Sequence, residues 1–195
     1  MQPPSSGPSI VEQGDNRAVP RPLRVLIANY FAYGSNLCQA RLRRRVSGVI
    51  LVSVARLDGF VLRWDKRSKD GSGKARVHRA PRGEGAVFGA VFQIPETQKP
   101  LLDQVEGLGF GYEELDVQVR APGGFPLPAW TYIAMPDDVD NSCVPYDWYR
   151  ELVVCGAQSL GLPGAYIDTL RSVSSRRDAD HARDQRERAF LPCST

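Results

Sequence analysis

The chain has 195 residues, of which 42% are hydrophobic and 24% are charged, with a formal net charge of +3. This length and composition predict one globular domain with a sizeable core, and so small a positive charge does not call for nucleic acid or a membrane as a partner. No apolar run approaches the roughly 18 residues of a membrane span, and the first residues lack the pattern of a signal peptide.

The cysteines and histidines predict no metal site. Four cysteines, Cys38, Cys143, Cys155 and Cys193, are scattered without a C-x-x-C spacing, and the chain has only two histidines. Free thiols fit a reducing compartment, so we expect a cytoplasmic protein.

Composition also divides the chain into three parts. Residues 1–22 carry five prolines among Ser, Gly and Gln. Such a segment cannot bury enough apolar surface to offset its chain entropy, which predicts a disordered extension. Residues 23–173 are expected to form the domain, and residues 174–195 a charged and solvated tail.

The first predicted elements are a strand that ends near Tyr33 and a helix over residues 37–45, with a tight turn between them. Gly34 permits unusual backbone angles, and Ser35 or Asn36 can cap the helix. Such a turn directs free N–H groups and the positive end of the helix dipole at one point, which suits an anion or a developing oxyanion. An ordinary strand-to-helix connection has the same pattern. The arginines of the helix predict a solvated face.

The remaining predicted elements are several strands, a helix, two strands and two further helices. A turn at Asp58-Gly59 predicts a hairpin between the first two strands of this set. Because helices interrupt a meandering sheet without a regular βαβ repeat, the order predicts an α+β fold. The expected strands lie at 49–57, 60–64, 74–79, 86–94, 112–120 and 127–134, and the expected helices at 98–106, 145–160 and from 163.

Glu106 is the titratable residue with the clearest catalytic pattern. It ends an apolar-faced helix and precedes Gly107, a left-handed stop. The negative end of the helix dipole and partial burial suit a carboxylate that accepts and returns a proton near neutral pH. An exposed helix-end glutamate has the same pattern, and Asp103 is the alternative, although one turn earlier it should point away from the loop.

Several motifs appear in an order typical of one enzyme family. Tyr-Phe-Ala-Tyr-Gly-Ser-Asn-Leu at residues 30–37 and Leu-Asp-Gln-Val-Glu-Gly at residues 102–107 resemble the paired motifs of the γ-glutamylcyclotransferase family. Further similarities follow at residues 54–57, 88–91 and 155–166, so the resemblance covers roughly residues 29–173.

The resemblance implies a small mixed β-barrel with surrounding helices, and an enzyme that needs no metal or cofactor. The implied reaction is the intramolecular cyclisation of a γ-glutamyl amino acid or amine to 5-oxoproline, with release of the amino acid or amine. Glu106 would be catalytic. The implied substrate-binding residues are Tyr30, Phe31, Ala32, Tyr33, Gly34, Ser35, Asn36 and Tyr149, although a core role fits Tyr149 equally well.

Two alternatives remain open on the same fold: removal of a γ-glutamyl group from a biosynthetic intermediate, and a catalytically silent binding module. The γ-glutamylamine and glutathione-degrading branches fit less well, because their loops differ. Val105, residues 107–112 and the basic loop 65–79 depart from the family pattern, which leaves the leaving group open. We expect a small-molecule γ-glutamyl substrate and neither nucleic acid nor membrane as partner, with a homodimer left open.

Overall fold

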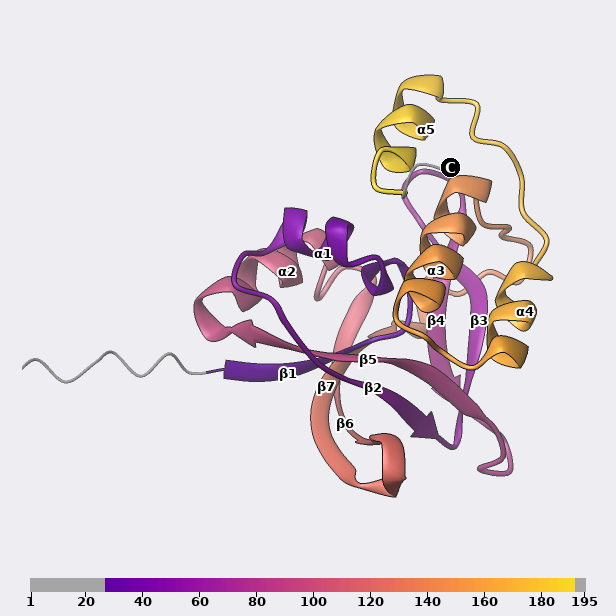
Figure 1. Ribbon diagram of the computed structural model, residues 1–195. Coiled ribbons are helices and arrows are strands. Elements are labelled where there is room, and N and C mark those ends of the chain that lie inside the picture. The colour runs from indigo at the N-terminus through magenta and orange to yellow at the C-terminus, as the bar shows by residue number, and fades with distance from the viewer. Residues whose placement is uncertain (1–26, 192–195) are drawn as a thin grey trace, which may run out of the picture.

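A closed β-barrel forms the centre of the computed structural model, which describes residues 27–191. Within these residues the strand order around the barrel is β1-β5-β2-β6-β7, and β3 and β4 form a separate two-stranded sheet. Figure 1 shows α1 and α2 together on one side of the barrel, and α3 and α4 beside the β3–β4 sheet. The predicted α+β barrel is thereby confirmed, whereas the extension predicted for residues 1–22 lies outside the described residues.

The elements have the following bounds. The barrel strands are β1 (Ile27–Ala32), β2 (Ile50–Asp58), β5 (Ala86–Pro95), β6 (Tyr112–Arg120) and β7 (Pro126–Ala134), and the second sheet has β3 (Phe60–Arg67) and β4 (Gly73–Arg79). The α-helices are α1 (Gln39–Arg45), α2 (Lys99–Glu106), α3 (Asp147–Ser159), α4 (Gly164–Arg171) and α5 (His181–Arg188). Short 3-10 helices are η1 (Ser35–Leu37), η2 (Glu96–Gln98), η3 (Pro122–Gly124) and η4 (Pro136–Asp138).

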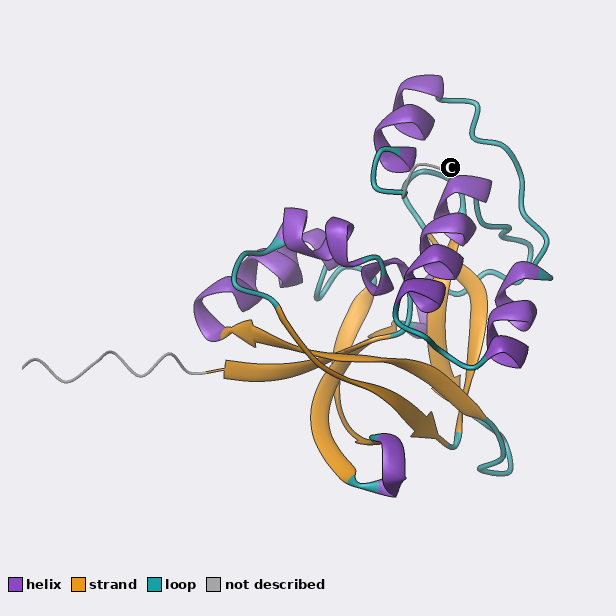
Figure 2. Ribbon diagram, viewed as in Figure 1, coloured by secondary structure: helices purple, strands orange, loops and turns teal. Residues whose placement is uncertain are grey.

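Strand β1 closes the barrel. It runs antiparallel to β5, with Tyr30 opposite Phe92, and parallel to β7, with Tyr30 opposite Trp130. The barrel interior and the faces beneath the helices are filled by fully buried apolar side chains, among them Phe31, Phe92 and Leu102. Each such side chain stabilises the fold by about 1.5–3 kcal/mol. Figure 2 shows that the helices lie mainly on one side of the barrel, whereas η3 lies at the opposite side.

The hairpin predicted at Asp58-Gly59 is wrong. Strand β2 pairs with β5 and β6, and β3 pairs with β4. Gly59 has a φ of 74°, donates its N–H to the carbonyl of Gly85 and accepts a hydrogen bond from the N–H of Ala80, both at 2.9 Å. These two hydrogen bonds hold the turn against the β4–β5 connection. The chain therefore leaves the barrel at Gly59 and continues into the separate β3–β4 sheet.

The segment after residue 173 contains a docked helix, which differs from the expected solvated tail. Helix α5 lies beyond α3 in Figure 1. Asp178, just before it, is buried and accepts hydrogen bonds from Arg183 and from the indole of Trp148 on α3. Glu187 pairs with Arg41 of α1. The charged side chains of this segment therefore form ion pairs with oppositely charged side chains of α1 and α3. No helix in the described range is long and apolar enough to span a membrane.

Candidate active site

The turn after β1 brings the predicted loop against α3 and β4. A Cβ atom on Gly34 would lie 3.3 Å from the Tyr149 hydroxyl oxygen and 3.4 Å from the Cβ of Ala75. Because the φ of Gly34 is −108°, a close approach and not a left-handed backbone makes glycine suitable here. The caps expected from Ser35 or Asn36 are wrong, since neither η1 nor α1 has a side-chain cap. The side chain of Asn36 instead faces α2.

Glu106 is the last residue of α2, and Gly107 ends the helix in the left-handed conformation as predicted. Its Oε1 accepts hydrogen bonds from Asn36 Nδ2 at 2.9 Å and from Arg45 Nη1 at 2.5 Å. Arg45 Nη1 also donates to Asn36 Oδ1 at 2.7 Å, so the three side chains form a closed triangle.

Two donors hold the carboxylate of Glu106 in place. The side chains of Arg45 and Glu106 are 17% and 18% exposed, so water screens their ion pair only partly. Hydrogen bonds to a charged group typically contribute about 1.5–3 kcal/mol. The position of the carboxylate is therefore fixed by Arg45 and Asn36.

A small inner pocket lies beside Glu106 and is walled by tyrosines. Burial, and then the negative charge of Glu106, raise the pKa of Tyr30, and burial raises the pKa of Tyr149. These phenols therefore stay neutral and can donate hydrogen bonds. The lining residues are Tyr30, Tyr33, Gly34, Ser35, Asn36, Ala75, Glu106, Tyr112, Tyr132 and Tyr149.

The structure thus brings most of the predicted residues of both motifs to one pocket, with two exceptions. Phe31 and Ala32 are fully buried, and Phe31 packs against Gly89 in the core. Tyr149 lines the pocket and is also a core residue: it is 5% exposed, and its hydroxyl accepts a hydrogen bond from the N–H of Ala75 at 3.1 Å.

Arg45 is the important residue that the sequence interpretation missed. The arginine run of α1 divides in two, with Arg43 and Arg44 exposed, Arg41 buried and Arg45 half-buried against Glu106. The spacing of four residues places Arg41 and Arg45 on one helix face. This spacing was the available signal that part of the run faces the protein. Tyr112 and Tyr132, also missed, had no such signal.

A wider cavity of about 580 Å³ adjoins the inner pocket and shares Ser35, Glu106, Tyr112 and Tyr149 with it. Its walls come from α1, the tip of the β3–β4 hairpin, the loop after α2, α3 and α5. The inner pocket has about 30 Å³, room for roughly two water molecules. A substrate larger than a few atoms must therefore occupy both spaces.

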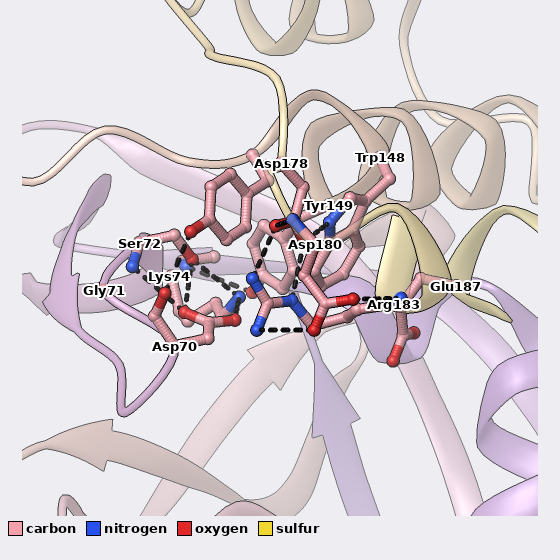
Figure 3. Close-up of polar contacts among 12 residues, drawn as sticks. Asp70, Gly71, Ser72, Lys74, Trp148, Tyr149, Asp178, Asp180, Arg183 and Glu187 are labelled. Atoms are coloured by element: carbon pink, nitrogen blue, oxygen red, sulfur yellow. Dashed lines mark hydrogen bonds and ion pairs between the residues drawn. The ribbon is translucent and has the colours of Figure 1, made fainter. Parts of the chain in front are cut away.

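Lys74 lies in the wall of the wide cavity, within the polar cluster of Figure 3. It donates to Asp70 Oδ2 at 2.7 Å and to Ser72 Oγ at 2.8 Å, and its Nζ lies 4.6 Å from the centroid of the Trp148 ring. Burial lowers the pKa of Lys74 to about 8, against the opposing effect of Asp70. In Figure 3 the Asp70–Lys74 group faces Arg183, which α5 contributes.

Metal ligands are not grouped in the part of the chain that the structure describes: no three His, Cys, Asp or Glu side chains there lie close enough to hold an ion.

Comparison with known proteins assigns the fold and the family. The barrel superposes on a solved γ-glutamyl cyclotransferase with a TM-score of 0.74 at 24% identity, covering 84% of this chain and 99% of the other, which defines a γ-glutamylcyclotransferase-like fold. Residues 86–170 match the AIG2-like family. The chain is 31% identical over 150 residues to γ-glutamylcyclotransferase of Bos taurus (74% of this chain, 77% of the relative). It is 27% identical over 164 residues to that of Mus musculus (81% and 85%). The chain belongs to the γ-glutamylcyclotransferase family.

Proposed function

We propose that this protein is a γ-glutamylcyclotransferase that converts a γ-glutamyl amino acid to 5-oxoproline and the free amino acid, with Glu106 as general base. Membership of the family supports the reaction. The observation that carries the role of Glu106 is its position: Arg45 and Asn36 hold its carboxylate beside a pocket formed by the loop after β1.

The reaction needs only proton transfers and one intramolecular attack. Glu106 takes a proton from the α-ammonium group of the substrate, and the freed amine attacks the γ-carbonyl carbon. The new C–N bond closes a five-membered ring, and the carbonyl oxygen becomes an oxyanion. When the oxyanion collapses, the bond to the leaving nitrogen breaks and Glu106 returns its proton to that nitrogen. The ring nitrogen, which still carries two hydrogens after the attack, releases one of them to the departing amine, so the products are the neutral lactam 5-oxoproline and a free ammonium group. Since both reacting groups belong to one molecule, correct orientation supplies much of the rate enhancement.

The loop after β1 is suited to bind the oxyanion or the α-carboxylate of the substrate. The first hydrogen bond within η1 is donated by the N–H of Leu37 to the carbonyl of Gly34. The preceding N–H groups, those of Ser35 and Asn36, are therefore not used by the turn. Preorganised donors of this kind typically contribute about 2.7–4 kcal/mol to the stability of a transition state.

Glu106→Gln tests this role. Glutamine keeps the size of the side chain and an acceptor for Arg45 but cannot accept the proton, so we expect a loss of about 10²–10⁴ in kcat. Formation of 5-oxoproline is measured from γ-glutamyl-alanine, glutathione and a γ-glutamyl amine. The matched control is Glu96→Gln, an exposed glutamate just before α2. Absence of product with every substrate, or full activity of Glu106→Gln, would disprove the proposal.

One further function is favoured by the size of the wide cavity. A volume of about 580 Å³ exceeds what an alanine leaving group needs. Removal of a γ-glutamyl group from a larger intermediate by the same chemistry is therefore a second candidate. It predicts a higher kcat/KM for γ-glutamyl conjugates of bulky amines than for γ-glutamyl-alanine.

We further propose a cytoplasmic location and a small-molecule substrate without nucleic acid. In the part of the chain that the structure describes, Cys38, Cys143 and Cys155 are free thiols, which supports a reducing compartment. Size-exclusion chromatography with light scattering tests the homodimer that the sequence leaves open.

A further inference from the structure

The charges around the wide cavity are unevenly compensated. Four of its cations have carboxylate partners, in the pairs Arg41–Glu187, Arg45–Glu106, Lys74–Asp70 and Arg183–Asp178. The other cations that line the cavity are Lys66, Arg67 and Lys69, all at the tip of the β3–β4 hairpin, and the remaining lining carboxylate is Asp138. The positive excess of the cavity is therefore concentrated at the hairpin tip.

Lys66 is the member of this group nearest the reaction centre. Its Nζ lies 4.7 Å from the centroid of the Tyr112 ring, and Tyr112 lines both the wide cavity and the inner pocket. A Cβ atom on Gly111 would lie 2.8 Å from the same Nζ, so the ammonium group rests on the loop that follows Glu106. The charge that acts most strongly on Lys66 is that of Asp138, which opposes the effect of burial on its pKa. The Lys66 ammonium group nevertheless forms no hydrogen bond or ion pair within residues 27–191, so its N–H donors are available to a ligand.

The backbone around Lys66 is held in place. Lys66 pairs with Val139 in an isolated antiparallel bridge, and the N–H of Asp140 donates to the carbonyl of Asp65 at 2.8 Å. The Asp65 carboxylate in turn accepts two hydrogen bonds from Arg76, at 2.5 and 3.0 Å. A cation on such a fixed strand binds an anion without first having to be ordered.

The same part of the cavity offers apolar surface. Phe110 is 82% exposed and Val105 is 50% exposed, and both line the cavity. Burial lowers the pKa of Lys66 because it makes the charged ammonium form less favourable. An anion bound beside Lys66 would stabilise that charged form. A short aliphatic chain that ends in a carboxylate matches this combination of an apolar wall and a cation.

We infer that the hairpin tip selects an acidic leaving group, an amino acid with a second carboxylate as in γ-glutamyl-glutamate, and that Lys66 is the specificity-determining residue. The inference rests on the proposed function. The γ-glutamyl group occupies the inner pocket and the space at Glu106, and the leaving amino acid extends across Tyr112 towards the hairpin. The cyclisation itself is the same as proposed above. The inference specifies only which amino acid is released.

The test compares two substrates of the same shape, γ-glutamyl-glutamate and γ-glutamyl-glutamine. The natural protein is expected to prefer the acidic substrate in kcat/KM by roughly tenfold, the value of one charge-assisted hydrogen bond. Lys66→Gln should reduce that preference to near unity, and Lys66→Arg should keep most of it. Arg63→Gln removes an exposed cation from the same strand outside the cavity and should leave the preference unchanged. Added salt should weaken the preference by screening.

The outcomes separate the two proposals. If neither substrate yields 5-oxoproline, the proposed function fails and the inference fails with it. If both are converted with equal kcat/KM, or if Lys66→Gln keeps the full preference, the reaction stands and the inference is overturned. Because the comparison within the natural protein needs no variant, misfolding of Lys66→Gln cannot hide a negative result.

Discussion

Arg45 Nη1 lies 2.5 Å from Glu106 Oε1, although the two residues are 61 positions apart in the chain. The same arginine nitrogen contacts Asn36, so the helix that follows the loop and the loop itself both hold the carboxylate. The position of the proposed base is thus set by the segment that is also proposed to bind the substrate. Displacement of this segment would change binding and proton transfer together.

Removal of the Arg45 guanidinium should lower activity. Arg45 donates to both Glu106 and Asn36, so Arg45→Gln takes away one of the two donors that hold the carboxylate. We expect kcat/KM to fall by roughly tenfold to a hundredfold, the value of a hydrogen bond to a charged group. Formation of 5-oxoproline from γ-glutamyl-alanine measures the effect, and Arg44→Gln, an exposed change on the same helix, is the control. An unchanged kcat/KM would show that Arg45 does not act on the base.

Asn36→Asp should impair activity with little change in shape. Asn36 Nδ2 donates to Glu106 and to the hydroxyl oxygen of Tyr30, each at 2.9 Å. Aspartate would remove both donors and place a second negative charge against Glu106. We expect kcat/KM to fall by roughly tenfold to a hundredfold. The assay is 5-oxoproline formation, beside the exposed change Asn141→Asp, which should behave as the natural protein.

Tyr149→Phe separates the two roles that remain open for this residue. The variant leaves the buried N–H of Ala75 without its acceptor, which should lower the free energy of unfolding by about 1–3 kcal/mol. If the hydroxyl also contacts substrate, KM for γ-glutamyl-alanine rises as well. Denaturant unfolding and steady-state kinetics measure the two effects separately, and an unchanged KM would assign Tyr149 to the core alone.

Local sequence patterns predicted those parts of the site that depend only on residues close together in the chain. The strand before Gly34 and the helix ending at Gly107 are fixed by apolar periodicity and glycine, so Glu106 was placed at the correct helix end. Tertiary partners were not predictable in this way. The pairing of β3 with β4 depends on where the chain leaves the barrel, and the partner of Arg45 lies on another element.

The same limit applies to the C-terminal segment. Its sequence has few apolar residues, which is typical of a solvated tail, yet Glu187 pairs with Arg41 of α1 and Asp178 accepts a hydrogen bond from the Trp148 indole of α3. Arg183, in the same segment, also donates to Asp178. Charge complementarity between distant elements leaves no periodic pattern in the sequence. Only the folded arrangement makes these contacts visible.

Stability should depend on Asp178 in a defined pH range. Hydrogen bonds from Arg183, and then from the Trp148 indole, hold the pKa of Asp178 well below its usual range. Its contribution is therefore present above about pH 4, the ordinary value for aspartate, and is lost as the pH falls towards the folded-state pKa. Asp178→Asn should lower the melting temperature at pH 7, and the difference should shrink in acid.

Thermal melts at pH 7 and pH 3, followed by circular dichroism, measure this. Asp168→Asn, an exposed aspartate on α4, is the control and should show no comparable pH-dependent difference. A constant deficit at both pH values would contradict the assigned role of the carboxylate.

The closure of the barrel through β1 also sets the order in which the protein can be assembled. Tyr30 pairs with Phe92 on β5 and with Trp130 on β7, so the first strand described finds its partners about 60 and 100 residues later. On a ribosome, the loop after β1 emerges long before the strands that position it. The candidate pocket therefore forms late in synthesis, because the loop after β1 has no supporting strand until β7 has left the exit tunnel.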